Sequence, residues 1–170
     1  MSKTPVISSG EQTIPVVVQT RTDLSPDECF NAIVPIDLSL VFTPWGPFPG
    51  VKEVHNQTGD WDSVGQSRNP QLTDGSAAFE QLTEYTAPHS FAYEITQFTG
   101  SLRFAVKAVR GEWTFTPDGD GTLIRWCYEF QPLPGRQLLI RRGIAPLWRR
   151  YMQRGIEGSK RVAEKLQGHQ

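Results

Sequence analysis

Alternation of apolar and polar residues runs through the middle of the chain and predicts β-strands. It is clearest at residues 122–131, where one face carries Ile124, Trp126, Tyr128 and Phe130. Such a strand is typical of an antiparallel sheet with one covered face and one wet face. A change of phase near Arg110 and Gly111 predicts a β-bulge there. Further strands are predicted at residues 14–22, 51–58, 65–72, 76–86, 89–98 and 102–116.

From Arg136 onward the apolar spacing becomes helical, which predicts one long amphipathic helix over residues 143–167. Pro146 suits the first turn of a helix and disrupts an interior turn, so two interpretations stay open. Either the helix begins near Ala145, or a preceding helical segment over residues 137–142 meets it at a kink. The apolar stripe consists of Ile144, Leu147, Trp148, Tyr151, Met152, Ile156, Val162, Ala163 and Leu166.

Two shorter helices are predicted after the first strand. Ser25, Pro26 and Glu28 form the pattern of an N-cap, a first-turn proline and a capping box, so a helix begins there and runs to about residue 34. Residues 37–42 predict a second short helix or turn. The order of elements predicts an α+β fold of the helix-grip type. In this fold a curved antiparallel sheet of six to seven strands wraps around the long C-terminal helix and leaves a cavity between them.

Length and composition favour a single domain over residues 1–170, with residues 1–12 as a loose lead-in. The chain is 38% hydrophobic and 21% charged, which is typical of a soluble globular protein. No apolar run approaches the roughly 20 residues of a membrane span, and the first residues lack the pattern of a secretory signal, so a cytoplasmic location is expected. Cys29 and Cys127 are far apart and predict free buried thiols.

The charges are unevenly distributed although the net charge is only -1. Residues 1–135 carry 8 Lys/Arg and 16 Asp/Glu, whereas residues 136–170 carry 9 Lys/Arg and 2 Asp/Glu. One interpretation is a solvated helix face that complements an acidic sheet. The other is a docking surface for an anionic membrane or an acidic carrier protein.

Several short segments carry a resemblance to a known family. In chain order they are Gly59-Asp60-Trp61-Asp62, Gly65 with Arg68, Asp74-Gly75, Leu82-Thr83-Glu84-Tyr85, Phe91-Ala92-Tyr93-Glu94 and Gly111-Glu112-Trp113-x-Phe115-Thr116-Pro117. With these segments and its element order, the chain resembles the SRPBCC superfamily. More narrowly, it resembles the bacterial polyketide cyclase/dehydrase-type branch, which is related to START lipid-transfer domains and the birch-pollen-allergen fold. The resemblance implies a cavity for a hydrophobic molecule such as a lipid, a polyketide or another aromatic or isoprenoid compound. It implies no catalytic residue, because only some members are enzymes and they share no universal motif.

Candidate catalytic groups are Arg68, Glu80 and Tyr93. An inward Arg68 binds a carboxylate or polarises a carbonyl, and an inward Glu80 is a candidate general acid or base. The alternatives are that Arg68 pairs with a strand glutamate such as Glu80, Glu94 or Glu112, and that Glu80 lies on a solvated face. Trp45 and Phe48 lie in a Pro/Gly-rich loop that is expected to cover the cavity mouth. The residues predicted to bind the ligand are Trp45, Phe48, Arg68, Leu82, Phe91, Tyr93, Trp126, Tyr128, Trp148, Met152, Gly155 and Ile156.

Other chemistries find no support in the sequence. His, Cys, Asp and Glu have no metal-ligand spacing, so no metal and no cofactor are predicted. Motifs for nucleophilic hydrolysis, nucleotide binding and dinucleotide binding do not occur, and the distribution of basic residues does not fit nucleic-acid binding. Three functions stay open: a hydrophobic-ligand binding protein, a polyketide cyclase, aromatase or dehydratase, and a membrane- or quinone-associated lipid chaperone. Either a monomer or a homodimer is compatible with the sequence.

Overall fold

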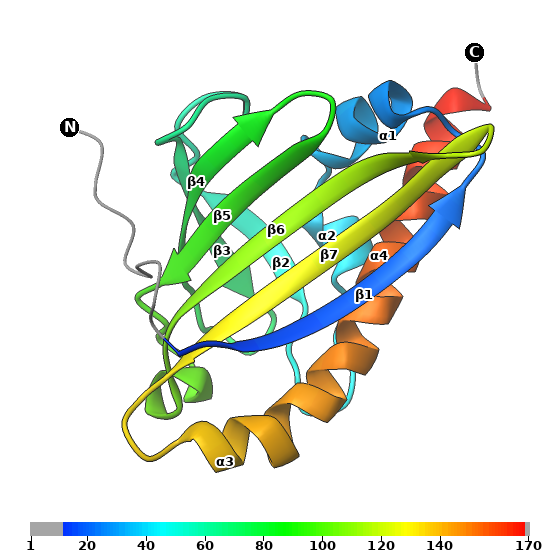
Figure 1. Cartoon of the computed structure of the whole chain (residues 1–170). Coiled ribbons are helices and arrows are strands. Elements are labelled where there is room, and N and C mark those ends of the chain that lie inside the picture. Colours follow the sequence, from blue (N-terminus) through cyan, green and yellow to red (C-terminus); the bar gives the residue numbers. More distant parts are fainter. Residues whose placement is uncertain (1–11, 169–170) are drawn as a thin grey trace.

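The computed structural model describes residues 12–168. A strand is followed by two short helices, six further strands and a C-terminal helical region (Figure 1). The strands are β1 (Ile14–Thr22), β2 (Val51–His55), β3 (Ser67–Leu72), β4 (Phe79–Thr86), β5 (Ser90–Thr96), β6 (Val106–Asp118) and β7 (Gly121–Pro132). The helices are α1 (Pro26–Ile33), α2 (Leu38–Val41), the 3-10 helix η1 (Ser101–Phe104), α3 (Gln137–Leu139), the π-helical turn η2 (Ile140–Ile144) and α4 (Ala145–Gln167).

All seven strands form one antiparallel sheet in the order β1-β7-β6-β5-β4-β3-β2. The sheet curves around α4. Helix α1 lies near one end of the space between them, and α2 lies nearer its middle (Figure 1). The predicted α+β helix-grip architecture is therefore confirmed, including the two short helices after the first strand. Within residues 12–168, no helix combines the length and the apolar character that a membrane span needs.

The bulge in β6 lies elsewhere than predicted. The register shifts between Val106 and Ala108, whereas Arg110 and Gly111 pair regularly with β7. Lys107 is exposed and is the extra residue, and Ala108 and Val109 are then both buried. The predicted start of this strand at residue 102 is also wrong, because residues 101–104 form η1.

The start of α1 follows the sequence closely. The backbone N–H of Glu28 donates to the hydroxyl of Ser25 at 3.3 Å, and the carboxylate of Glu28 accepts from the backbone N–H of Ser25 at 2.7 Å. The Ser25 backbone N–H and the Ser25 hydroxyl, which donates to the same carboxylate at 2.8 Å, lower the pKa of Glu28 because they favour its charged form. Two otherwise unpaired donors of the first turn are satisfied in this way, which confirms the predicted capping box.

The two interpretations at Pro146 prove to be compatible. The long helix α4 begins at Ala145, and a helical segment made of α3 and η2 precedes it. Proline donates no backbone hydrogen bond, and the wider π-turn ends at Ile144, two residues before Pro146. The helical path changes direction between α3 and α4 (Figure 1).

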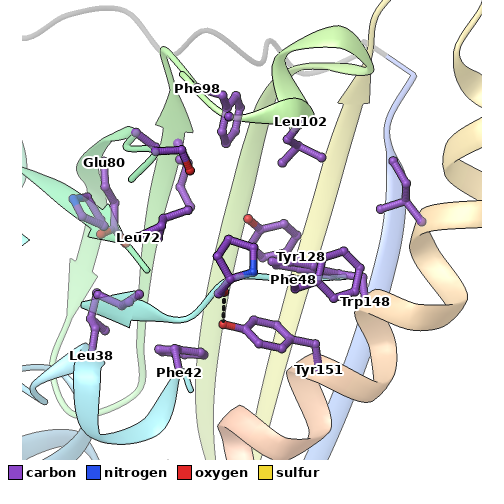
Figure 2. Close-up of a pocket in the computed structure, with 18 of the residues that line it drawn as sticks. Leu38, Phe42, Phe48, Leu72, Glu80, Phe98, Leu102, Tyr128, Trp148 and Tyr151 are labelled. Atoms are coloured by element: carbon purple, nitrogen blue, oxygen red, sulfur yellow. Dashed lines mark hydrogen bonds between the residues drawn. The ribbon is translucent and has the colours of Figure 1, made fainter. Parts of the chain in front are cut away.

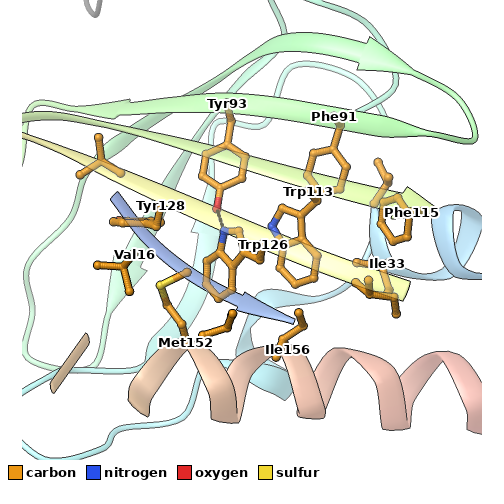
Figure 3. Close-up of a cluster of buried hydrophobic side chains, with 14 of the residues drawn as sticks. Val16, Ile33, Phe91, Tyr93, Trp113, Phe115, Trp126, Tyr128, Met152 and Ile156 are labelled. Atoms are coloured by element: carbon orange, nitrogen blue, oxygen red, sulfur yellow. Dashed lines mark hydrogen bonds between the residues drawn. The ribbon is translucent and has the colours of Figure 1, made fainter. Parts of the chain in front are cut away.

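The core lies between the sheet and α4. Aromatic side chains from β5, β6 and β7 point toward Met152 and Ile156 on the helix (Figure 3). Trp113 stacks on Phe91 and on Trp126, with ring centroids 6.1 and 4.8 Å apart. This cluster fills one part of the interior, and the cavity occupies another.

Candidate functional site

A cavity of about 560 Å³ lies between the sheet, α4 and the loop that follows α2. Its wall is built mainly from aliphatic and aromatic side chains that come from both short helices, β2 to β7, η1, α3, η2 and α4. Leu38 and Phe42 line it on one side, Leu72 and Phe98 on the sheet side, and Trp148 on the helix side (Figure 2). The volume falls within the roughly 300–1,000 Å³ typical of small-molecule pockets.

A buried ion pair forms a polar spot in this apolar wall. The Nε of Arg68 lies 2.6 Å from a carboxylate oxygen of Glu80, and the two side chains are 7% and 5% exposed. The residues face each other across β3 and β4, so the antiparallel register brings them together. Arg68 also lies over the ring of Trp61, with its Cζ 3.9 Å from the ring centroid. Both Arg68 and Glu80 line the cavity, and the guanidinium has four N–H donors besides Nε.

Tyr93 supplies a second polar group. Its hydroxyl accepts a hydrogen bond from the Nε1 of Trp126 at 3.1 Å (Figure 3). Burial raises the pKa of Tyr93, the charge of Glu80 raises it further, and hydrogen bonds from Trp113 and Trp126 offset only part of that rise. The phenol is therefore neutral at physiological pH and has a proton to donate.

Gly111 makes room for the ring of Tyr93. The two residues are paired across β5 and β6, and a Cβ on Gly111 would lie 2.2 Å from the Cζ of Tyr93. Sequence reasoning did not assign Gly111 to the site. A glycine inside a strand is nevertheless a known sign of close approach by another group.

Aromatic contacts join α4 to the loop after α2. Phe48 meets Trp148 edge to face with ring centroids 4.9 Å apart, and the Tyr151 hydroxyl donates to the Pro49 carbonyl at 3.0 Å (Figure 2). Burial raises the pKa of Tyr151 to about 12. The ring of Tyr128 packs against Trp148 from the sheet side, at 5.0 Å. The loop thus forms part of the cavity wall, and its role as a cover over the mouth stays a prediction.

The predicted site residues divide into two groups. The residues that line the cavity are Phe48, Arg68, Glu80, Phe91, Tyr93, Trp126, Tyr128 and Trp148. Their contact with a ligand stays a prediction. The residues that lie outside the cavity wall are Trp45, Leu82, Met152, Gly155 and Ile156.

Each residue outside the wall has another structural role. Leu82, Met152 and Ile156 are fully buried in the hydrophobic core. A Cβ on Gly155 would lie 2.6 Å from the ring of Phe42, so this glycine allows α4 to approach that ring. Trp45 pairs with Phe48 through two backbone hydrogen bonds of 3.0 Å, which close the loop on itself.

Sequence reasoning missed part of the wall. Phe98, Leu102 and Phe104 line the cavity from η1 and the residues before it. The predicted strands 89–98 and 102–116 placed Phe98 at the end of one strand and Leu102 and Phe104 at the start of the next, so the helical turn η1 was not expected here. Leu139 and Leu147 line it from the start of the helical region, although both are partly exposed.

The described residues contain no group of three or more His, Cys, Asp or Glu side chains placed to hold a metal ion. His55 lies outside the cavity wall and 3.3 Å from Glu53, with both side chains half exposed. The polar groups of the cavity wall are the Arg68–Glu80 pair, tyrosine and tryptophan side chains, and further polar residues that include Asp74, Ser76 and Arg136.

The family model described as "Polyketide cyclase / dehydrase and lipid transport" matches residues 14–164. No curated protein matches the sequence. Among solved structures, Ara h 8.0201 superposes with a TM-score of 0.67 at 13% identity, covering 91% of this chain and 99% of its own. XoxI from Bacillus cereus gives 0.64 at 13% identity, over 90% and 97% of the two chains. Ginseng major latex-like protein 151 from Panax ginseng gives 0.61 at 14% identity, over 87% and 95%. At these identities, the structures support the fold alone.

Proposed function

Because the chain belongs to the polyketide cyclase, dehydrase and lipid transport family of the SRPBCC superfamily, we propose that its cavity binds one amphiphilic small molecule. The observation that carries this proposal is the cavity of about 560 Å³, with its largely apolar wall and its buried Arg68–Glu80 pair. Apolar walls favour a hydrophobic ligand because binding removes apolar surface from water. The Arg68–Glu80 pair favours a ligand that also carries a polar oxygen group, such as a carbonyl or a hydroxyl.

The position of the polar groups suggests how the ligand lies. Glu80 is on the sheet side of the cavity, and Trp148 and Tyr151 are on the helix side (Figure 2). A carbonyl, carboxylate or hydroxyl at one end of the ligand would accept from the guanidinium of Arg68 or from the hydroxyl of Tyr93. The body of the ligand would pack on the flat faces of the aromatic residues, which suits a planar or isoprenoid skeleton.

The first test uses the fluorescent probe 1-anilinonaphthalene-8-sulfonate and the variant Leu102→Trp, which places a large ring in the cavity wall. We expect the probe to bind the unmodified protein and the variant to bind it about tenfold or more weakly, equivalent to about 1.4 kcal/mol. Leu40→Trp is the control, because Leu40 is 64% exposed and lies outside the wall. Equal weakening in both variants, or no binding to the unmodified protein, would refute cavity binding. Native mass spectrometry of the purified protein would identify a retained ligand.

A second function, the cyclisation or dehydration of a polyketide chain, draws on the fact that Arg68, Glu80 and Tyr93 line one cavity. In this mechanism Glu80 takes a proton from the carbon beside a substrate carbonyl. Arg68 and Tyr93 stabilise the resulting enolate oxygen, and the enolate carbon attacks another carbonyl of the same chain. The oxygen of that carbonyl takes up the proton that Glu80 removed, which leaves an aldol hydroxyl and regenerates the Glu80 carboxylate. Incubation with a soluble poly-β-ketone would detect the cyclised product. Tyr93→Phe should lower the turnover rate more than the substrate affinity. No product with the unmodified protein would remove the enzymatic alternative and leave ligand binding intact.

A further inference from the structure

Exposed apolar side chains gather at one end of the molecule, around the opening of the cavity. Phe104 on η1 and Leu138 on α3 are 62% and 61% exposed, and Leu139 and Leu147 are also exposed. Helices η1 and α3 lie at the same end of the sheet (Figure 1). The backbone N–H of Leu133 donates to the carbonyl of Ala105, which links the residue after η1 to the loop before α3. Leu139, Leu147 and Phe104 also line the cavity, so the exposed apolar surface is continuous with its wall.

The two segments that form this opening carry only basic charges, although the exposed Asp74 of a neighbouring turn also lines the cavity. Residues 95–111 and 130–156 contain no Asp or Glu, and the second stretch contains six arginines. Arg103, Arg136, Arg141 and Arg142 are exposed, and Arg136 lines the opening. Within residues 12–168, no ion pair involves Arg136, Arg141 or Arg142. We define the mouth rim as Phe104, Leu138, Leu139 and Leu147 together with Arg103, Arg136, Arg141 and Arg142.

An anionic lipid bilayer suits both components of this surface. Guanidinium groups form paired hydrogen bonds with phosphate, and exposed aliphatic side chains enter the interfacial region of a bilayer. Arginine contacts alone or apolar contacts alone do not attach a protein stably to a bilayer, but the two together do. A water-soluble acidic partner would match the arginines and leave the leucines and Phe104 without a matching apolar surface.

We propose that the mouth rim docks on bilayers that contain anionic phospholipid, which places the opening of the cavity against the lipid. Docking itself does not require an occupied cavity, so it can be tested apart from ligand binding. The consequence for the proposed function is that a ligand passes between bilayer and cavity without crossing water.

The experiment is flotation of the purified protein with vesicles of phosphatidylcholine alone or mixed with phosphatidylglycerol. We expect the protein to float only with the anionic vesicles. Raising the salt from about 0.1 M to about 1 M should release it, because the screening length falls from roughly 10 Å to 3 Å. No flotation with anionic vesicles, or equal flotation with both kinds, would overturn the proposal.

Charge reversal tests the position of the docking surface. Arg141→Glu/Arg142→Glu should weaken binding to anionic vesicles by about 30-fold or more, since each basic residue near such a surface contributes substantially to attraction. Arg154→Glu/Arg161→Glu has the same net charge, and its two exposed sites lie about three to five turns farther along the helical path. This control should bind nearly as well as the unmodified protein. Equal losses in the two double variants would overturn the assignment to the mouth rim.

The apolar component is tested by Leu138→Ser, with Leu40→Ser as the control at an exposed leucine on α2. Leu138 lies outside the cavity wall, so this change is expected to leave probe binding in vesicle-free buffer unaltered. Flotation should fall for Leu138→Ser alone. Equal flotation of the two variants would contradict the apolar contact, and arginine-dependent binding to polyglutamate without flotation would assign the surface to an acidic partner instead. Loss of probe binding with normal flotation would refute the cavity function and leave docking intact.

Discussion

Replacing Glu80 by Gln tests whether the Arg68–Glu80 pair is a desolvated ion pair. The substitution keeps the shape of the side chain and leaves the guanidinium of Arg68 buried, 7% exposed, without its anionic partner. Removing one partner of a buried pair costs about 3–5 kcal/mol, because the remaining charge is neither hydrated nor neutralised. The ring of Trp61 at 3.9 Å offsets part of that cost, so we expect the lower end of the range.

Urea unfolding followed by tryptophan fluorescence measures the effect. With a slope of about 2 kcal/mol per M, a loss of about 3 kcal/mol moves the midpoint down by about 1.5 M. The double variant Arg68→Met/Glu80→Gln removes the unpaired charge and should recover most of the loss. Glu112→Gln is the matched control, since Glu112 pairs with Arg110 on the sheet at 3.1 Å with side chains 36% and 42% exposed. It should cost at most about 1 kcal/mol.

Two results would refute this reasoning. A loss in Glu80→Gln no larger than in Glu112→Gln would mean that water reaches the pair as it reaches a surface pair. A double variant as unstable as Glu80→Gln alone would mean that the cost comes from lost packing, not from an unpaired charge.

Three further predictions concern packing, titration and capping. Gly111→Ala should lower the free energy of unfolding by about 1–3 kcal/mol, because the added Cβ meets the ring of Tyr93. Gly143→Ala is the control in the same urea assay and should be tolerated, because its Cβ would lie 3.5 Å from its nearest neighbour, the Cδ1 of Leu139. Burial raises the pKa of Tyr93 and of Tyr128, so absorbance titration should show these phenols ionising later than free tyrosine, and stability, unaffected below about pH 10, should fall as the pH rises further. Ser25→Ala should cost about 1 kcal/mol by removing the N-cap of α1, and a cost near zero in thermal unfolding would contradict the capping role.

The local elements could be predicted because short-range chemistry decides them. The bounds of β1 match the predicted strand, and α1 begins at the predicted cap. The alternation in β7 places Ile124, Trp126, Tyr128 and Phe130 in the interior, as predicted. In each case the structure depends on residues close together in the chain: the capping residues of a helix, or the alternation of side chains along one strand.

The candidate site could be predicted only in part. Aromatic residues on the inward face of a strand, such as Tyr93 and Tyr128, line the cavity. On the apolar stripe of α4, Trp148 lines the cavity, whereas Met152 and Ile156 lie in the core. Helical spacing identifies the buried face and does not tell which positions along it meet packed side chains and which meet empty space. The 3-10 helix η1, where a strand was expected, also adds Leu102 and Phe104 to the wall.

By itself, the sequence determined the strand periodicity, the capped helix, the amphipathic final helix and their order, because these depend on neighbours close in the chain. The tertiary structure alone decided that Arg68 faces Glu80 across two strands, that Gly111 admits the ring of Tyr93, and that the mouth rim unites η1 with α3. Those pairings depend on sheet register and on the curvature of the sheet around α4. Both arise from the simultaneous packing of all the elements, and no single segment encodes them.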